Sequence, residues 1–176
     1  MSAPRHGSIL FAVLVYVLGI AVGYAGGGGP GSKEYVEQLA SMVRELLALG
    51  PLGTYVAIFA NNAAVTIAAV LGGFLLFTPI LILFVNGVVL GALLAYTSTL
   101  YSMPEVLALI LPHGVFEIPA FILACGIGVD IAARVLERGF RDTLARLDAY
   151  MSAYRIVLLL LAIAAAIETL LIYSRM

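Results

Sequence analysis

The chain has few charged residues, one cysteine and no surplus of basic residues, and each scarcity excludes a class of protein. Charged residues make up 11% of its 176 residues, against about 25% in a typical soluble domain. So few charges cannot cover a water-facing surface, which excludes a soluble enzyme and a disordered tail. Because Cys125 is the only cysteine, a disulfide-stapled secreted module is excluded as well. Nine Lys and Arg against ten Asp and Glu leave no basic footprint for nucleic acid.

Apolar residues dominate instead, at 63% of the chain. Residues 46–104, a run of 59, include no Asp, Glu, Lys, Arg or His. A membrane-spanning helix needs about 20 apolar residues, so this run crosses a bilayer at least twice. We therefore predict an all-α, polytopic transmembrane helix bundle that forms a single integral membrane domain over residues 1–176.

Five spans are predicted, at residues 8–25, 53–74, 79–96, 104–129 and 156–173. The fourth is expected to be broken or kinked at Pro112-His113-Gly114 and disturbed again at Pro119. A proline inside a helix removes a backbone hydrogen bond and clashes with the preceding turn. Broken helices at membrane depth are tolerated only where they are buried in protein or line a cavity, so the fourth span is expected to do one or the other.

Two more polar stretches, 32–49 and 134–152, have apolar residues at helical spacing and are predicted to form amphipathic surface helices. With a cytoplasmic N-terminus, six of the nine basic residues fall in segments predicted to face the cytoplasm. These six are Arg5, Arg134, Arg138, Arg141, Arg146 and Arg155. The positive-inside rule therefore favours a multi-pass protein of the cell membrane with its N-terminus in the cytoplasm.

Polar side chains inside predicted spans are the strongest candidates for function, because a charged group at the bilayer centre costs about 2.5–3.5 kcal/mol. His113 and Glu117 are four residues apart, which places them on one face of a helix. Glu168 needs a partner of its own. We predict that these residues and three asparagines converge in an intramembrane polar cluster: His113, Glu117, Glu168, Asn61, Asn62 and Asn86.

Three interpretations of the cluster compete. The favoured one is a polar network that fixes how the helices dock, for which no cofactor is expected. The second is a transport or small-ligand site lined by the broken helix. The third is a divalent metal site, such as zinc, in which His113, Glu117 and Glu168 supply three ligands and water the fourth. The sequence contains no HExxH, no GxSxG and no other known catalytic signature, so an enzyme is not favoured.

The residues around the cluster also resemble a known family. The string LPHGVFEIPA at 111–120 is its most specific element. It is accompanied by Asn61-Asn62 before Gly72-Gly73, Asn86-Gly87 followed by Gly91, and AAIE at 165–168. Together these resemble the pattern of the stage II sporulation protein M family of integral membrane proteins, over roughly residues 59–171. The resemblance implies that the residues of interest are Asn61, Asn62, Asn86, His113, Gly114, Glu117 and Glu168.

The layout of the chain, compared with what the resemblance implies, favours scaffolding or transport over an enzyme. The namesake of the family works in a membrane complex that remodels peptidoglycan through a partner protein. In this chain only the roughly 27 residues from 26 to 52 are predicted to lie outside the membrane on the far side, which leaves no room for a hydrolase domain. We therefore expect a non-enzymatic scaffold or assembly component. A transporter or channel for a small solute or ion is the alternative, and a metal-binding membrane hydrolase the second alternative.

The expected partners follow from the same features. Membrane lipids surround the spans, and membrane or envelope proteins are expected from the resemblance. Small-residue pairs at Gly19/Gly23 and Gly87/Gly91 allow helices to approach closely. Because these pairs are present and water-exposed surface is scarce, we predict a homodimer.

Overall fold

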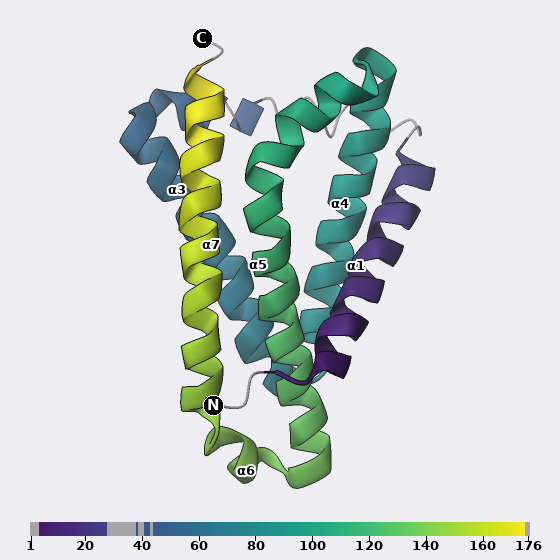
Figure 1. Ribbon diagram of the computed structural model, residues 1–176, viewed down its shortest axis with the longest axis vertical. Coiled ribbons are helices and arrows are strands. Elements are labelled where there is room, and N and C mark those ends of the chain that lie inside the picture. Colours follow the sequence, from purple (N-terminus) through teal and green to yellow (C-terminus); the bar gives the residue numbers. More distant parts are fainter. Residues whose placement is uncertain (1–3, 28–37, 39–40, 43, 175–176) are drawn as a thin grey trace.

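The computed structural model is a bundle of long helices (Figure 1). It describes residues 4–27, 38, 41–42 and 44–174. Within this part of the chain, five helices are long and apolar enough to cross a membrane. The predicted all-α transmembrane bundle with about five spans is therefore confirmed.

The spanning helices run up and down in turn. They are α1 (His6–Gly26), α3 (Gly50–Leu71), α4 (Thr78–Leu100), α5 (Met103–Arg138) and α7 (Leu147–Tyr173). A 3₁₀ turn, η1 (Gly72–Leu75), extends α3, and a short helix, α6 (Phe140–Leu144), connects α5 to α7. Because the number of crossings is odd, α1 begins at one end of the bundle and α7 ends at the other (Figure 1).

Local sequence explains where several of these helices begin. Helices α3, α4 and α5 each carry a proline in their first turn, where no intrahelical donor is needed. At the start of α5, the Glu105 carboxylate accepts hydrogen bonds from both the backbone N–H and the hydroxyl of Ser102, at 2.9 and 2.6 Å. This capping box fixes the point at which α5 enters the bundle.

Helix α5 is continuous over 36 residues, so the predicted break at Pro112–Gly114 does not interrupt it. The helix bends instead, and its first part runs obliquely before the rest descends through the bundle (Figure 1). Pro112 and Pro119 both lie inside α5 with exposed side chains. Their rings therefore point away from the core, and the helix accommodates the missing donors by curving rather than by ending.

The stretch 134–152, predicted as one amphipathic helix, is not a single element. Helix α5 extends to Arg138, α6 follows, and α7 already begins at Leu147. Gly139 separates α5 from α6 with a φ of 85°, a conformation that side chains other than glycine rarely adopt. Of the other predicted surface helix, 32–49, most of the first part lies outside the described residues, and 44–48 are helical.

Helix α5 occupies the centre of the bundle, between the α3–α7 pair and the α1–α4 pair (Figure 1). On one side, side chains such as Phe121, Ile127 and Leu161 bury the contact of α5 with α3 and α7. On the other side, Leu83 and Cys125 belong to a second core shared with α1 and α4. The central helix therefore presents its residues to every other spanning helix.

The small-residue pairs predicted to mediate dimerisation pack against each other within the chain, between α1 and α4. A Cβ atom added to Gly23 would meet the backbone carbonyl of Val88, and one added to Gly91 would meet that of Ile20. Such backbone contact is typical of small-residue helix pairs in membranes. The homodimer stays a prediction. The glycine faces that favoured it form the contact between α1 and α4 within one chain.

Candidate functional site

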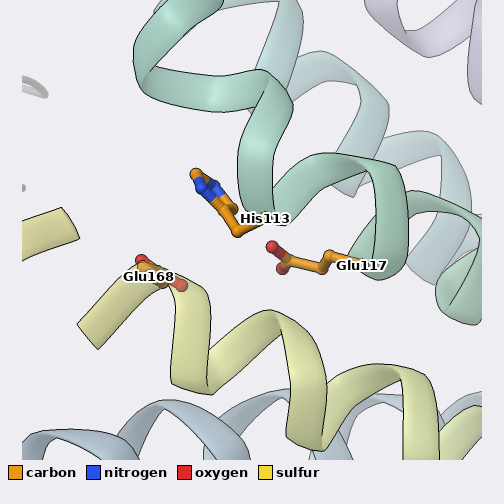
Figure 2. A group of neighbouring side chains, drawn as sticks. All are labelled: His113, Glu117 and Glu168. Atoms are coloured by element: carbon orange, nitrogen blue, oxygen red, sulfur yellow. The ribbon is translucent and has the colours of Figure 1, made fainter. Parts of the chain in front are cut away.

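Three of the predicted polar residues converge between α5 and α7. His113 and Glu117 extend from α5 and Glu168 from α7 toward the same space (Figure 2). One ligand atom from each, an imidazole nitrogen and two carboxylate oxygens, lies within 4.8 Å of the other two. The spacing of four residues places His113 and Glu117 on one face of α5, and α7 packs along that helix.

The two asparagines of α3, Asn61 and Asn62, connect to this group by hydrogen bonds. Asn62 Nδ2 donates a hydrogen bond to Glu117 Oε1 at 3.2 Å, and Asn61 Nδ2 donates to Asn62 Oδ1 at 3.4 Å. Asn86 of α4 does not join them, because its Nδ2 donates to the Ile82 carbonyl of its own helix at 2.8 Å. The predicted cluster therefore consists of five connected or neighbouring residues, with Asn86 apart.

A cavity of about 870 Å³ lies beside the cluster. All five spanning helices and residues of the stretch 42–49 contribute to its wall. The lining includes the six predicted cluster residues, the adjacent Gly114, and one further acid, Glu45. No Lys or Arg lines the cavity within the part of the chain that the structure describes. Asn86 thus shares the cavity with the other five without bonding to them.

His113 has an unsatisfied polar atom at this site. Its Nδ1 is buried and has no hydrogen-bond partner among the described residues. Leaving a buried polar atom unpaired costs about 1–3 kcal/mol, so such atoms usually have a partner in the working protein. His113, which lines the cavity, therefore has one ring nitrogen whose partner is not among the described residues.

Residues 45–47, which precede α3 and partly line the cavity, are held in place by side chains of α3 and α7. Thr54 Oγ1 donates to the Leu46 carbonyl at 2.6 Å, and Tyr173 OH donates to the Leu47 carbonyl at 3.2 Å. The two hydroxyl groups are also 3.2 Å apart. This arrangement holds Glu45 and Leu46 in the cavity wall.

The cluster lies within a sequence region that matches a known family. The profile of the family described as Stage II sporulation protein M matches residues 8–171, nearly the whole chain. The chain belongs to this family. Comparison with curated proteins and with solved structures returned no match. The family and the five apolar helices together establish a multi-pass membrane protein.

This member of the stage II sporulation protein M family has a further acid apart from the cluster, Asp130 of α5, which is buried and 3% exposed. Arg5 Nε donates to Asp130 Oδ1 at 2.6 Å, Tyr150 OH donates to Oδ2 at 2.6 Å, and Ser8 Oγ donates to Oδ1 at 3.3 Å. Arg5 Nη1 also reaches both carboxylate oxygens of Glu137, at 2.9 and 3.0 Å. We call these five residues the Asp130 network.

The sequence analysis did not find this network. Asp130 lies between the predicted fourth span, which ends at 129, and the predicted surface helix 134–152, so no expectation covered it, and Arg5 contributed only to the orientation. A lone Asp between apolar neighbours, one turn before Arg134, was the available signal. Hydrogen bonds to Asp130 and then to Glu137 raise the pKa of Arg5 above its ordinary value, so the guanidinium stays charged.

Proposed function

We propose that this protein binds a small cation inside the membrane and serves as a transporter or channel for it. The supporting observation is the cavity of about 870 Å³ whose wall contains His113, Glu117 and Glu168. A polar network with a purely structural role packs against its own partners, as protein interiors generally do. The cluster instead borders space of the size that small-ligand sites have.

The charge of the lining favours a cation over an anion or a neutral solute. Glu45, Glu117 and Glu168 contribute carboxyl groups, and no Lys or Arg accompanies them among the described lining residues. Charges interact more strongly in a low-dielectric interior than in water. Intramembrane ionisable residues that face a cavity mark ion and substrate pathways in membrane proteins.

We place the protein in the cell membrane with its N-terminus in the cytoplasm. Six of nine basic residues then fall on the cytoplasmic side, as the positive-inside rule requires. Arg5 and Asp130 pair at that end of the bundle. Under this orientation the stretch 42–49, which contributes to the cavity wall, lies on the outer side.

A scaffold or assembly role is the second candidate, and membership of the stage II sporulation protein M family supports it. Membrane or envelope proteins, or a second copy of the chain, would then dock on the outer faces of the helices. A metal-dependent hydrolase stays a prediction that rests on the donor types alone. The scaffold differs from the transporter in one measurable respect, because it needs no water-filled cavity.

Thiol accessibility tests the proposal. Ala57→Cys and Leu93→Cys place thiols in the cavity lining on α3 and α4, while the native Cys125 is fully buried and gives the unreactive background. In membrane vesicles of one orientation, we expect both thiols to react with a membrane-impermeant cationic methanethiosulfonate. Reaction with an anionic reagent of similar size should be slower. Leu81→Cys, 62% exposed on α4 and outside the lining, is the matched control for a thiol that faces lipid.

The double variant Glu117→Gln with Glu168→Gln sharpens this test. It should lower the preference for the cationic reagent several-fold while the cavity thiols still react. Unreactive thiols at both positions, with rates like that of Leu81→Cys, would contradict the proposal and favour the scaffold. A preference for the anionic reagent would contradict it as well.

A further inference from the structure

The ligand set of the cluster is more specific than a generally acidic cavity. It combines one imidazole nitrogen with two carboxylate oxygens from different helices, all within 4.8 Å of one another. Mg²⁺ and Ca²⁺ prefer ligand sets made of oxygen alone, whereas one of the three ligands here is an imidazole nitrogen. Imidazole together with carboxylate suits first-row transition ions, and zinc sites that exchange a ligand have three protein ligands and one open position.

The surroundings of the three side chains have the features of a metal site. Asn62 holds one oxygen of Glu117 at 3.2 Å and is itself held by Asn61, which leaves the second Glu117 oxygen free to bind. Hydrogen bonds of this kind orient metal-binding carboxylates in known sites. The buried, unpartnered Nδ1 shows that the described residues do not satisfy the imidazole of His113.

We propose that His113, Glu117 and Glu168 bind one divalent first-row transition metal ion, with zinc as the best fit, and leave its fourth position open to the cavity. This inference rests on the proposed cation-binding function and names the class of cation. Ligand atoms in a tetrahedral zinc site lie about 3.3 Å apart, given metal–ligand distances of about 2.0 Å. Small rotations of the two glutamate side chains bring them to that separation, and the neighbouring cavity gives them room.

An open position distinguishes this site from a structural zinc site. Structural zinc usually has four protein ligands and is fully enclosed. Here the described residues that can hold a metal form a group of three, and the group borders a cavity. The ion is therefore expected to exchange, as a transported or reacting ion must.

Zinc binding to the purified full-length protein tests the inference. After treatment with a chelator, the protein in detergent is titrated with zinc chloride by calorimetry, and we expect one ion per chain. Millimolar Mg²⁺ or Ca²⁺ should not compete. His113→Ala and Glu168→Gln should each weaken binding at least 100-fold, and Asn62→Ala about 10- to 100-fold through loss of orientation.

Two controls separate metal binding from a folding defect. Asp142→Asn and Asp148→Asn each remove an exposed carboxylate that lies outside both the cavity lining and the group of three, so both should bind zinc like the wild type. Co²⁺ in place of Zn²⁺ gives visible absorption bands that report on the ligands directly. These bands should change in His113→Ala and Glu168→Gln and stay the same in both controls.

Three results would overturn the inference. They are less than one zinc ion bound per ten chains, zinc binding by His113→Ala equal to that of the wild type, and equal competition by Mg²⁺. If zinc binding fails while the cavity thiols still prefer the cationic reagent, the metal assignment is wrong and the cation-binding function stands. If both fail, both proposals are wrong.

Discussion

The two polar centres of α5 differ in how completely their atoms are paired. Asp130, near one end, accepts hydrogen bonds from three side chains on two other helices and the chain start. Near the other end, Glu117 accepts one hydrogen bond from Asn62, and His113 Nδ1 has no partner among the described residues. Both centres contain an acid of α5, and the second borders the cavity of about 870 Å³.

The comparison separates stability from function. A buried charge with all its partners is costly to break, because removing one group leaves the others unpaired. A buried charge with few partners already bears that cost in the folded protein. The Asp130 network is therefore expected to stabilise the bundle. The His113 cluster is expected to lower the stability of the fold, because its polar atoms lack partners and remain available to bind a ligand.

The largest effect is expected for Asp130→Ala. It leaves the hydroxyls of Tyr150 and Ser8 without their acceptor, while Arg5 is partly exposed and keeps Glu137, so the free energy of unfolding should fall by about 3 kcal/mol. Reversible unfolding in mixed micelles with increasing dodecyl sulfate measures the change. Glu137→Ala, which removes a more exposed partner of Arg5, should cost about 1 kcal/mol or less. Equal losses in the two variants would show that burial of the carboxylate does not decide its contribution to the Asp130 network.

A smaller loss, about 2 kcal/mol, is expected for Tyr150→Phe. This change removes the hydrogen bond to the buried Asp130 carboxylate and the weaker one that the hydroxyl accepts from Arg134 Nε at 3.3 Å, and it keeps the ring that packs in the core. The same unfolding measurement applies. Tyr101→Phe, at a tyrosine that is 54% exposed, is the matched control and should leave stability unchanged. A loss of the same size in the control would mean that the hydrogen bond to Asp130 is not the cause.

Arg5→Lys should cost about 1 kcal/mol, because an ammonium lacks the planar fork that holds Asp130 and Glu137 at once. The charge is kept, so orientation in the membrane should not change. Unfolding in micelles measures the stability, and protease protection of the N-terminus in vesicles checks the orientation. Stability equal to the wild type would show that charge alone, without the fork, supports the network.

The smallest effect, with opposite sign, is expected for Glu168→Gln. It replaces a carboxylate that faces Glu117 and His113 with a neutral amide, so stability should stay the same or rise by about 1 kcal/mol in metal-free protein. The measurement is unfolding after treatment with a chelator. A loss as large as that of Asp130→Ala would make the cluster a structural network and favour the scaffold.

Much of the fold could be predicted from the sequence, because lipid imposes few solutions on an apolar chain. The uncharged run 46–104 and its glycine and proline turns indicated two helices close to where α3 and α4 lie. The boundary of the fourth span was less accurate. Helix α5 extends nine residues past the predicted end at 129, since Asp130 and Arg134 find partners in the bundle and need no water.

The convergence of the site was partly predictable. Spacing alone placed His113 and Glu117 on one face of a helix. The cost of burying Glu168 indicated that its carboxyl group needs a polar partner. Two facts had no local signal. The cavity depends on how five helices pack, and the position of Asn86 apart from the others depends on a hydrogen bond to its own helix. Whether the six residues act together in function is a prediction that the zinc titration addresses.

The length of α5 has a mechanical consequence. Asp130 lies 13 residues beyond Glu117, or about 20 Å along the axis. The far end of the helix is clamped to the chain start by Arg5, while Pro112 and Pro119 have removed two backbone hydrogen bonds from the near end. Helix α5 is therefore fixed at Asp130 and bends more easily around Pro112 and Pro119. Any opening of the cavity that involves α5 therefore tilts its proline-containing part, and the helix does not slide as a whole.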